Sequence, residues 1–480
     1  MYVDRHLVER INVVEFQLSV DGHGVDSAAR FPVENPATGQ VFAYAPDSSA
    51  STVDSVMASA SNAFARWRSG DGARCEALAR CAAAIMSAAD ELAALLTAEQ
   101  GKPLADAMSE VRATAGWFSH FSKFTAPSEI LQDDATALVD VKRSPLGVVL
   151  AITPWNYPLL LAGFKLAPAL RAGNTVVLKP SPYTPLSSLA LGEILSAVLP
   201  SGVVQVITGL DSLGPVLTRH PQVRKISFTG STTTGRLVAE SAARGLKHVT
   251  LELGGNDAAI MLDDLTPRDV VDRIFWSAFA NNGQTCIAIK RLYVPRSSYE
   301  ETVDLLAECA NQVAVGAGDQ EGIRLGPLNN ALQLETVSSM VDAAVRAGAD
   351  AVTGGRLIDR PGYFYEPTIV TGAADDSDLV AREQFGPALP VLVYDDLDEA
   401  VERANATDFG LGGSVWGTDR ERAASVASRL DCGNAWVNTH MTLSPNLPFA
   451  ATKSSGLGVE NGLLGYLSFT ELQTRHIPKG

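Results

Sequence analysis

Short apolar runs separated by helix-length segments fill most of the chain and predict its fold. The first set lies at residues 148–152, 175–178, 203–207 and 225–228, and a second set lies at 258–261, 291–294 and 389–394. Strands that are apolar on both faces and are joined through helices are typical of parallel sheets covered by helices on each side. We therefore expect two parallel-sheet α/β domains that meet near residues 253–255.

Helical patterns precede these strands. The positions that recur at helical spacing are Val53, Met57, Ala60, Phe64 and Trp67. They begin within the sequence Ser-Thr-Val-Asp at 51–54, which has the form of a helix N-terminal cap. The alanine-rich segment 74–96 predicts one further helix that ends near residues 100–103. Residues 31–46 contain Asn-Pro and Thr-Gly pairs and predict a strand and a turn.

Two segments have patterns of another kind. Residues 144–164 carry no charge and are long enough to span a bilayer, but Pro145, Pro154 and Pro158 interrupt any helical ladder. We interpret this segment as a buried strand, a turn and the start of a helix, and not as a membrane span. Residues 133–143 alternate and predict a projecting antiparallel strand, whose free edge favours pairing with another subunit.

Composition excludes several classes of protein. The 480 residues include 38 Lys+Arg and 54 Asp+Glu, and the net charge of -16 repels nucleic acids and anionic membrane surfaces. The start of the chain, Met1–His6, lacks the basic and apolar segments of an export signal. Five cysteines form no CxxC pair, so we expect neither a disulfide framework nor a metal site. These features favour a cytoplasmic protein.

Cys286 is the candidate for covalent chemistry, and two other residues supply what a reactive thiol needs. Asn156 lies in a proline-stiffened turn after a predicted strand, where its amide can donate to a developing oxyanion. Glu252 is flanked by apolar residues and a glycine pair, so its pKa should be raised, as a general base requires. Considered one at a time, Cys286 could also be a buried apolar thiol, Asn156 an asparagine that stabilises a turn, and Glu252 a capping glutamate.

Further polar residues at predicted strand ends suit a nucleotide. Residues 228–236 run from a strand through a Gly/Ser/Thr turn into a helix and form a backbone cradle for pyrophosphate. Arg236 stands where a P-loop needs lysine, and the chain has no Gly-x-Gly-x-x-Gly. Lys179 can reach ribose or phosphate, and residues 382–387 suit a sugar and a flat ring. Taken alone, Lys179 could equally be an ordinary surface lysine, and the segments 228–236 and 382–387 could be ordinary turns.

Together these motifs resemble the aldehyde dehydrogenase superfamily, specifically its NAD(P)-dependent, hydrolytic, non-acylating members. The matching segments are 154–158, 228–235, 251–256, 283–286, 383–387 and the tail from Pro448-Phe449. The step of 34 residues from Glu252 to Cys286 and the step of 97 residues from Cys286 to Glu383 are also similar to the family. The resemblance covers almost the whole chain.

This resemblance implies that an aldehyde is oxidised to the carboxylic acid through a cysteine thiohemiacetal and a thioester. Cys286 would be the nucleophile, Asn156 and the Cys286 amide would stabilise the oxyanion, and Glu252 would activate the hydrolytic water. An acid at position 252 favours hydrolysis over transfer to coenzyme A. The implied cofactor-binding residues are Trp155, Lys179, Ser181, Pro182, Gly230, Ser231, Glu383 and Phe385, and Lys165 and Glu460 match polar positions linked to the base.

The resemblance also bears on substrate and cofactor choice. The implied substrate tunnel consists of Tyr157, Phe164, Thr285, Ile287 and Phe449. Because this set is apolar and partly aromatic, we expect medium aliphatic or aromatic aldehydes in preference to charged semialdehydes. Pro182 stands where many NAD-preferring relatives have glutamate, which leaves NAD and NADP both open, with a preference for NAD. Ala450-Ala451 and Val459 depart from the family pattern near the loop that closes the site.

Domain limits and assembly follow from the same resemblance. It implies a Rossmann-like dinucleotide-binding domain at 1–122 and 143–252, a catalytic domain at 253–432 and a small β oligomerisation element at 123–142 and 460–480. That element would build a homodimer or a homotetramer. The alternatives are a semialdehyde dehydrogenase, a catalytically silent binding member of the family, and a thiol hydrolase. The last is disfavoured as the main role by the intact cofactor positions.

Overall fold

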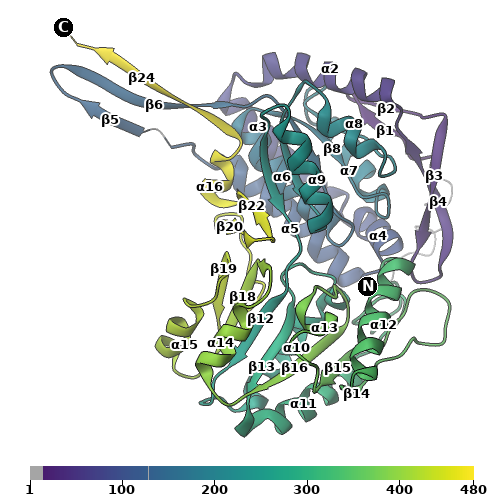
Figure 1. Cartoon of the computed structure of the whole chain (residues 1–480). Coiled ribbons are helices and arrows are strands. Elements are labelled where there is room, and N and C mark those ends of the chain that lie inside the picture. Colours follow the sequence, from purple (N-terminus) through teal and green to yellow (C-terminus); the bar gives the residue numbers. More distant parts are fainter. Residues whose placement is uncertain (1–14, 128, 480) are drawn as a thin grey trace.

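Two lobes and a projecting arm make up the protein, in a computed structural model that describes residues 15–127 and 129–479 (Figure 1). The first lobe is built on an eight-stranded sheet and the second on a seven-stranded sheet. The chain passes between them from β11 (His248–Glu252) to β12 (Asp257–Met261). The predicted class, two α/β units with a small β element, is confirmed. The expectation drawn from Met1–His6 lies outside the described residues.

The sheet of the first lobe is parallel in its centre and antiparallel at its edges. Its order is β2-β1-β9-β8-β7-β10-β11-β22, and the five strands from β9 to β11 are parallel. The predicted strands are confirmed within a few residues. Their bounds are β1 Leu18–Val20, β2 His23–Val25, β7 Val148–Ile152, β8 Thr175–Lys179, β9 Val204–Val206, β10 Val223–Thr229 and β22 Gly456–Leu457.

Helices cover this sheet, and a two-stranded hairpin lies beside them (Figure 1). The hairpin consists of β3 (Ala29–Asn35) and β4 (Gln40–Asp47), as the pattern at 31–46 predicts. The helices are α2 Ala50–Trp67, α3 Asp71–Ser87, α4 Ala89–Gln100, α5 Leu104–Ser122, α6 Pro158–Ala172, α7 Leu186–Ser196, α8 Leu213–Arg219 and α9 Thr232–Ala243. Residues 144–164 form β7, a turn and the start of α6, as predicted.

Two helix predictions were wrong in detail. Helix α2 begins at Ala50, where the Ser49 hydroxyl accepts the Thr52 amide at 3.1 Å, so the cap lies two residues before the predicted one. The single helix predicted at 74–96 is two helices, α3 and α4, which are bent by 67° around Ala88. No proline or glycine marks this break, which is why apolar periodicity alone missed it.

The second sheet has the order β14-β15-β16-β13-β12-β18-β19, parallel except for the edge strand β14. Its further strands are β13 Ile289–Pro295, β14 Asp350–Thr353, β15 Thr368–Thr371, β16 Ala388–Tyr394, β18 Gly412–Trp416 and β19 Asn434–Val437. Its helices are α10 Val271–Phe279, α11 Tyr299–Gln312, α12 Ala331–Arg346, α13 Asp378–Ala381, α14 Leu397–Asn405 and α15 Arg420–Ala427.

Alternate residues of β12 explain why its sequence is apolar throughout. Ala259 and Met261 belong to one buried apolar cluster, whereas Ala258 and Ile260 belong to another. Because successive side chains of a strand point to opposite faces, both faces of this sheet are covered by helices. Burial on both faces therefore explains the apolar runs from which the central strands were predicted.

The arm is a three-stranded antiparallel sheet that extends away from the first lobe (Figure 1). Its strands are β5 (Glu129–Asp133), β6 (Ala137–Pro145) and β24 (Thr470–Pro478). The projecting strand predicted at 133–143 is thus present as β6. The remaining α-helix and strands are α16 (Gly462–Leu467), β17 (Phe409–Gly410), β20 (Phe449–Ala450), β21 (Thr452–Lys453) and β23 (Val459–Glu460).

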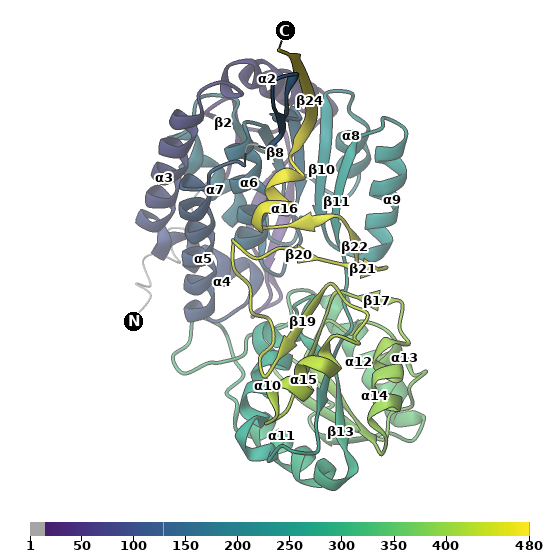
Figure 2. The same ribbon diagram turned by 90° about the vertical axis from the view of Figure 1, so that its left-hand side faces the viewer.

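The last part of the chain joins the two lobes before it enters the arm. Figure 2, a quarter turn from Figure 1, shows β20, β21 and β22 at the level between the lobes. Over residues 15–127 and 129–479, no single helix combines the length and apolar character needed to cross a bilayer; only the bent pair α3–α4, taken together, has both.

Candidate active site

Cys286 follows a strained turn in the second lobe. Asn281, Asn282 and Gly283 adopt left-handed conformations in succession, with φ of 53°, 56° and 67°. Such conformations are costly for residues other than glycine and persist where the surroundings hold them. The Asn282 side-chain amide donates to the Gly326 carbonyl at 2.5 Å, which anchors the turn. The turn delivers Cys286 to the edge of the large cleft between the lobes.

Buried side chains hold the peptide carbonyls on either side of the thiol. Lys290 Nζ donates to the carbonyls of Thr285 at 2.6 Å and Cys286 at 3.2 Å. His440 Nε2 donates to the carbonyl of Ile287 at 2.8 Å. With these carbonyls engaged, the backbone around Cys286 has a fixed orientation, as a preorganised oxyanion site needs.

Burial and nearby carboxylates make the thiol of Cys286 a weak acid. Burial raises its pKa to about 12, and the carboxylates of Glu383, Asp257 and Glu252 act in the same direction, whereas Lys290 opposes them. The thiolate, and not the thiol, is the nucleophile. Reactivity of Cys286 in this form of the protein therefore increases with pH.

Asn156 is held through its side-chain amide nitrogen and through its backbone carbonyl. Its Nδ2 donates one hydrogen to the Gln284 carbonyl at 2.9 Å, which fixes the orientation of the amide. Its own backbone carbonyl accepts hydrogen bonds from Lys102 Nζ at 2.8 Å and from Asn281 Nδ2 at 3.1 Å. The amide group carries a second hydrogen, and Asn156 and Cys286 line the same cleft. Asn156 is thus placed to donate to an oxyanion.

Glu252 ends β11 beside the cleft but does not line it. The side chain is buried, and neither carboxylate oxygen has a hydrogen-bond partner among the described residues. Burial raises the pKa of Glu252 well above its ordinary value, and the Glu460 carboxylate raises it further. Lys165 pairs with Glu460 at 2.5 Å and opposes this increase in the pKa. These are the surroundings of a general base that works near neutrality.

The cleft between the lobes has a volume of about 770 Å³, within the usual range of roughly 300–1,000 Å³ for ligand pockets. It lies at the carboxyl ends of strands β7, β8 and β10, where α/β proteins bind ligands. All eight residues predicted to bind a cofactor line it: Trp155, Lys179, Ser181, Pro182, Gly230, Ser231, Glu383 and Phe385.

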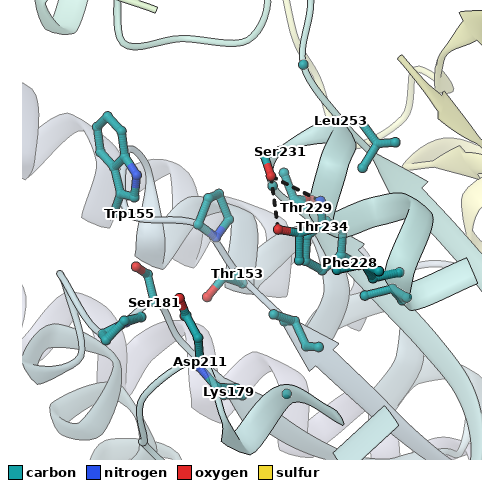
Figure 3. A pocket seen from close by; sticks show the side chains of 18 of the residues that line it. Thr153, Trp155, Lys179, Ser181, Asp211, Phe228, Thr229, Ser231, Thr234 and Leu253 are labelled. Carbon is teal, nitrogen blue, oxygen red and sulfur yellow. Dashed lines mark hydrogen bonds between the residues drawn. The ribbon is translucent and has the colours of Figure 1, made fainter. Parts of the chain in front are cut away.

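The N-terminus of helix α9 lines the cleft and is suited to bind phosphate. Ser231 caps this helix and accepts the Thr234 amide at 3.2 Å, and the amides that precede Thr234 in the first turn have no partner within the helix. Figure 3 shows Lys179, Ser181 and Asp211 close together, apart from Ser231 and Thr234. An extended dinucleotide could therefore contact both groups while its phosphates lie at the helix N-terminus.

Glu383 and Phe385 form the cleft wall near Cys286. Glu383 Oε1 accepts the Gly255 amide at 3.0 Å and lies 3.7 Å from Lys290 Nζ. Phe385 has a left-handed φ of 48° and meets the ring of Trp155 edge to face at 5.3 Å. A bulky residue in this conformation is uncommon and marks a site that its surroundings hold in place.

The five predicted tunnel residues make contacts of three kinds in the structure. Ile287 and Phe449 pack with Leu411 in an apolar cluster that also contacts Cys286. The Tyr157 and Thr285 hydroxyls lie 3.5 Å apart. Phe164, in contrast, stacks on Trp117 with centroids 4.6 Å apart inside the core of the first lobe. Of the five predicted tunnel residues, Ile287 and Phe449 are therefore the two that belong to the apolar cluster in contact with Cys286.

Several residues at the site were not predicted from the sequence. Met441 and Leu443 extend the apolar cluster around Ile287, and Trp436 joins it as well. His440 and Asp257 lie behind the thiol, fully buried, with 3.6 Å between Nε2 and Oδ2. Because these two residues are far apart in the sequence, they leave no local signal. Such a buried pair can be recognised only in the folded structure, where the two segments lie side by side.

The thiol of Cys286, the amide of Asn156 and the buried carboxylate of Glu252, beside a cleft of this volume, fit a nucleotide-dependent oxidoreductase that works through a cysteine. The family model described as "Aldehyde dehydrogenase family" matches residues 24–475. The chain belongs to the aldehyde dehydrogenase family, and it is an NAD(P)-dependent enzyme of that family, as the sequence predicted.

Relatives of several kinds are similar over nearly the whole chain. A probable aldehyde dehydrogenase of Pseudomonas sp. is 42% identical, covering 96% of this chain and 94% of its own. Phenylacetaldehyde dehydrogenase of Pseudomonas fluorescens is 38% identical, over 95% and 94% of the two chains. Glutarate-semialdehyde dehydrogenase of Pseudomonas aeruginosa is 37% identical, over 95% and 96%. These relatives differ in substrate, so family membership alone does not assign one.

Solved structures share the fold throughout. An NAD+ complex of aldehyde dehydrogenase from Bacillus cereus superposes with a TM-score of 0.95 at 32% identity, covering 100% of both chains. The eight-stranded sheet, the seven-stranded sheet and the arm are therefore the family architecture.

Proposed function

We propose that this protein oxidises an uncharged aldehyde to its carboxylic acid, with NAD as the preferred cofactor. The observation that carries the proposal is the combination of Cys286 and Asn156 on the cleft with the unpartnered, buried carboxylate of Glu252 next to it, among the described residues. Each of the three chemical tasks, attack, oxyanion stabilisation and water activation, has one residue suited to it.

The steps follow from these three residues. The Cys286 thiolate attacks the aldehyde carbon, and the resulting oxyanion accepts hydrogen bonds from Asn156 Nδ2 and the Cys286 amide. Glu383 would help to hold the nicotinamide, which would supply a hydride acceptor when bound. Loss of the hydride from the substrate carbon would leave a thioester on Cys286. Glu252 takes a proton from water, the hydroxide adds to the thioester carbon, and the carbon–sulfur bond breaks to release the acid and the thiolate.

The preference for NAD rests on Asp211. The pKa of Lys179 is lowered to about 8 by burial, and the carboxylate of Asp211 is the main group that opposes this decrease. Asp211 also raises the pKa of Tyr183. Asp211 lines the cleft together with Lys179, which by the family resemblance would contact the adenosine ribose. A carboxylate there repels a 2′-phosphate, a task that Pro182 cannot perform.

This cofactor assignment is testable by direct binding. Asp211→Asn should tighten NADPH binding about tenfold and leave NADH binding within about threefold, because one nearby negative charge is removed at a partly exposed position. Fluorescence titration of both reduced cofactors measures the two Kd values. The exposed Asp376→Asn in the second lobe is the matched control. Equal affinities for NADPH in all three proteins would exclude this role of Asp211.

The substrate assignment rests on the apolar cluster beside the thiol. Ile287, Leu411 and Phe449 are buried there, and Trp436, Met441 and Leu443 pack against them. An anionic substituent in such surroundings would lose its hydration without a partner. Initial rates with hexanal, benzaldehyde and succinic semialdehyde, each with NAD and NADP, test this proposal. A clear preference for succinic semialdehyde would favour the alternative of a semialdehyde dehydrogenase.

Assembly and location complete the proposal. The arm carries exposed apolar side chains on its outer strands, including Ile130, Leu131 and Leu472, and such exposure is typical of an interface. We propose a homodimer or homotetramer built on the arm. All five cysteines are free, which favours a reducing cytoplasmic setting.

A further inference from the structure

Lys102 is a fully buried cation whose ammonium group is surrounded by partners. Its Nζ donates to Glu110 Oε2 at 2.6 Å and to the Asn156 carbonyl at 2.8 Å, and it lies 3.7 Å from the centroid of the Tyr157 ring. Lys102 and Glu110 have no exposed side-chain surface. Burying an ion pair costs several kcal/mol of desolvation, so well-packed apolar residues would often serve stability as well or better. The pair is therefore a poor candidate for stabilisation alone.

Glu110 binds the backbone that follows Asn156 in the sequence. Its Oε1 accepts the amides of Leu159 at 2.9 Å and Leu160 at 3.1 Å, which belong to the first turn of α6. The carboxylate thus takes the place of an N-terminal cap, since Tyr157 at the cap position makes no side-chain hydrogen bond to the helix. One ion pair consequently fixes the backbone at and after the turn that carries the Asn156 amide.

The same turn is tied to the second lobe. The Asn156 carbonyl also accepts Asn281 Nδ2, and the Asn156 side-chain amide donates to the Gln284 carbonyl, and both of these residues belong to the turn that delivers Cys286. The backbone around Lys102 contacts the second lobe as well, because the Leu104 amide donates to the Gly318 carbonyl at 2.9 Å. Lys102 therefore lies where the donor residue of one lobe meets the thiol turn of the other.

We propose that Lys102, paired with Glu110, is a positioning residue that holds the Asn156 amide at the distance from Cys286 that oxyanion stabilisation requires. The proposal rests on the function proposed above, in which Asn156 is the donor. Lys102 does not line the cleft, and in this proposal it acts through Asn156. A displacement of about 1 Å at a reacting centre can cost roughly 10²-fold in rate, so loss of this anchor should be visible in kcat.

The first experiment is the substitution Lys102→Met, together with Lys102→Met/Glu110→Gln. The double variant avoids an unpaired buried carboxylate, while the introduced glutamine keeps an oxygen for the amides of α6. We expect both to lower kcat with the best aldehyde about 10- to 100-fold, with NADH Kd within about threefold of the wild type. We also expect the second-order rate of Cys286 alkylation by iodoacetamide, without cofactor, to stay within about threefold, since alkylation forms no oxyanion.

A double-mutant cycle with Asn156→Ala separates positioning from general damage. Asn156→Ala alone should lower kcat about 10²- to 10³-fold, the usual effect of one lost oxyanion donor. In that background, Lys102→Met should lower kcat by less than about threefold, because the amide it positions is gone. Full additivity of the two effects would overturn the role of Lys102, as would an unchanged kcat in Lys102→Met.

Two further outcomes have separate meanings. If Asn156→Ala itself leaves kcat unchanged, the oxyanion assignment in the proposed function fails, and with it the role of Lys102. If Lys102→Met slows alkylation as much as it slows turnover, the thiol turn and not Asn156 has moved, which overturns this inference only. Arg171→Met is the matched control, since it removes a buried cation paired with Asp71 at the far end of α6. It should lower stability while kcat stays within about twofold.

Discussion

Residue scale

The carboxylate of Glu252 is in an uncommon state, buried and without a hydrogen-bond partner in the part of the chain that the structure describes. Polar atoms in this state are costly, and proteins normally pair them. The cost is consistent with a group that must bind a water molecule during turnover. Its neighbour Glu460 is paired with Lys165, whereas Glu252 has no such partner among the described residues.

Glu252→Gln should separate the two halves of the reaction. We expect stopped-flow records to keep a burst of NADH close to one per active site, while steady-state turnover falls about 10²- to 10⁴-fold, because only thioester hydrolysis needs the base. Glu402→Gln, on the exposed face of α14, is the control and should behave as the wild type. Steady-state turnover that is unchanged in Glu252→Gln would contradict the assignment.

The pH dependence has a definite sign. The reactive forms of Glu252 and Cys286 are the deprotonated ones, and burial raises both pKa values above their ordinary range. The rate of the wild type should therefore increase with pH from neutrality into the alkaline range. Alkylation of Cys286 by iodoacetamide in the free enzyme should follow the same direction and reports the thiol alone. A rate of alkylation that is flat between about pH 6 and about pH 9 would be inconsistent with the raised pKa.

The residues that sequence reasoning identified share one property. Cys286, Glu252 and Glu383 each sit in a contiguous motif of glycines and polar residues, so the local sequence carries the signal. Lys102 and His440 were missed because their function depends on partners that are distant in the sequence, such as the Asn156 carbonyl 54 positions from Lys102. Such contacts arise from tertiary packing and leave no periodic trace.

Element scale

Helix α4 ends at Gly101, whose conformation and surroundings both require glycine. Its φ is 99°, and a Cβ atom there would lie 2.8 Å from the side chains of Pro327 and Pro36. The close approach brings the turn before Lys102 against the second lobe. The end of this helix therefore sets where Lys102 enters the site.

Gly101→Ala should destabilise the protein more than the same change at Gly348. Gly348 has a φ of 107° but no atom within 4 Å of the added Cβ, so it measures the conformational cost alone, about 1 to 2 kcal/mol. Gly101→Ala adds overpacking, about 1 to 3 kcal/mol more. Urea unfolding of both variants gives the difference in the free energy of unfolding. Equal losses would show that the prolines move aside without cost.

Strands were predicted better than helix ends. The central strands β7 and β8 of the first sheet are largely apolar runs, because both faces are buried, and this signal is independent of exact boundaries. The break at Ala88 has no glycine or proline. The acidic pair Asp90-Glu91, which falls in the first turn of α4, is the kind of signal that marks a helix start.

Whole-molecule scale

The arm exposes apolar side chains that a monomer would leave in water. Leu131 and Leu472 are 57% and 55% exposed, on β5 and β24. Leu131→Asp/Leu472→Asp should shift the oligomer to a smaller species in light scattering, since charges in an apolar interface are unfavourable. Leu332→Asp, at a position that is 65% exposed on α12, is the control and should keep the native mass. An unchanged mass for the double variant would exclude these positions from the interface.

The two lobes each contribute part of the site. Asn156 and Glu252 belong to the first sheet and its connections, whereas Cys286 and Glu383 belong to the second. The fold class could be predicted because strand patterns are local. The packing of one lobe on the other could not, because it depends on contacts between distant segments, such as Leu104 with Gly318.

This division of the site between the lobes makes catalysis a reporter of how they dock during denaturation. Separation of the lobes disrupts the contact between Asn156 and the Gln284 carbonyl while each sheet keeps its strands. We therefore expect urea to abolish turnover at a lower concentration than it abolishes far-ultraviolet circular dichroism, as in local unfolding generally. If turnover and circular dichroism were lost at the same urea concentration, the lobes would separate only when they unfold. Residual structure without activity would in turn mean that mild stress inactivates the enzyme before any strand is lost.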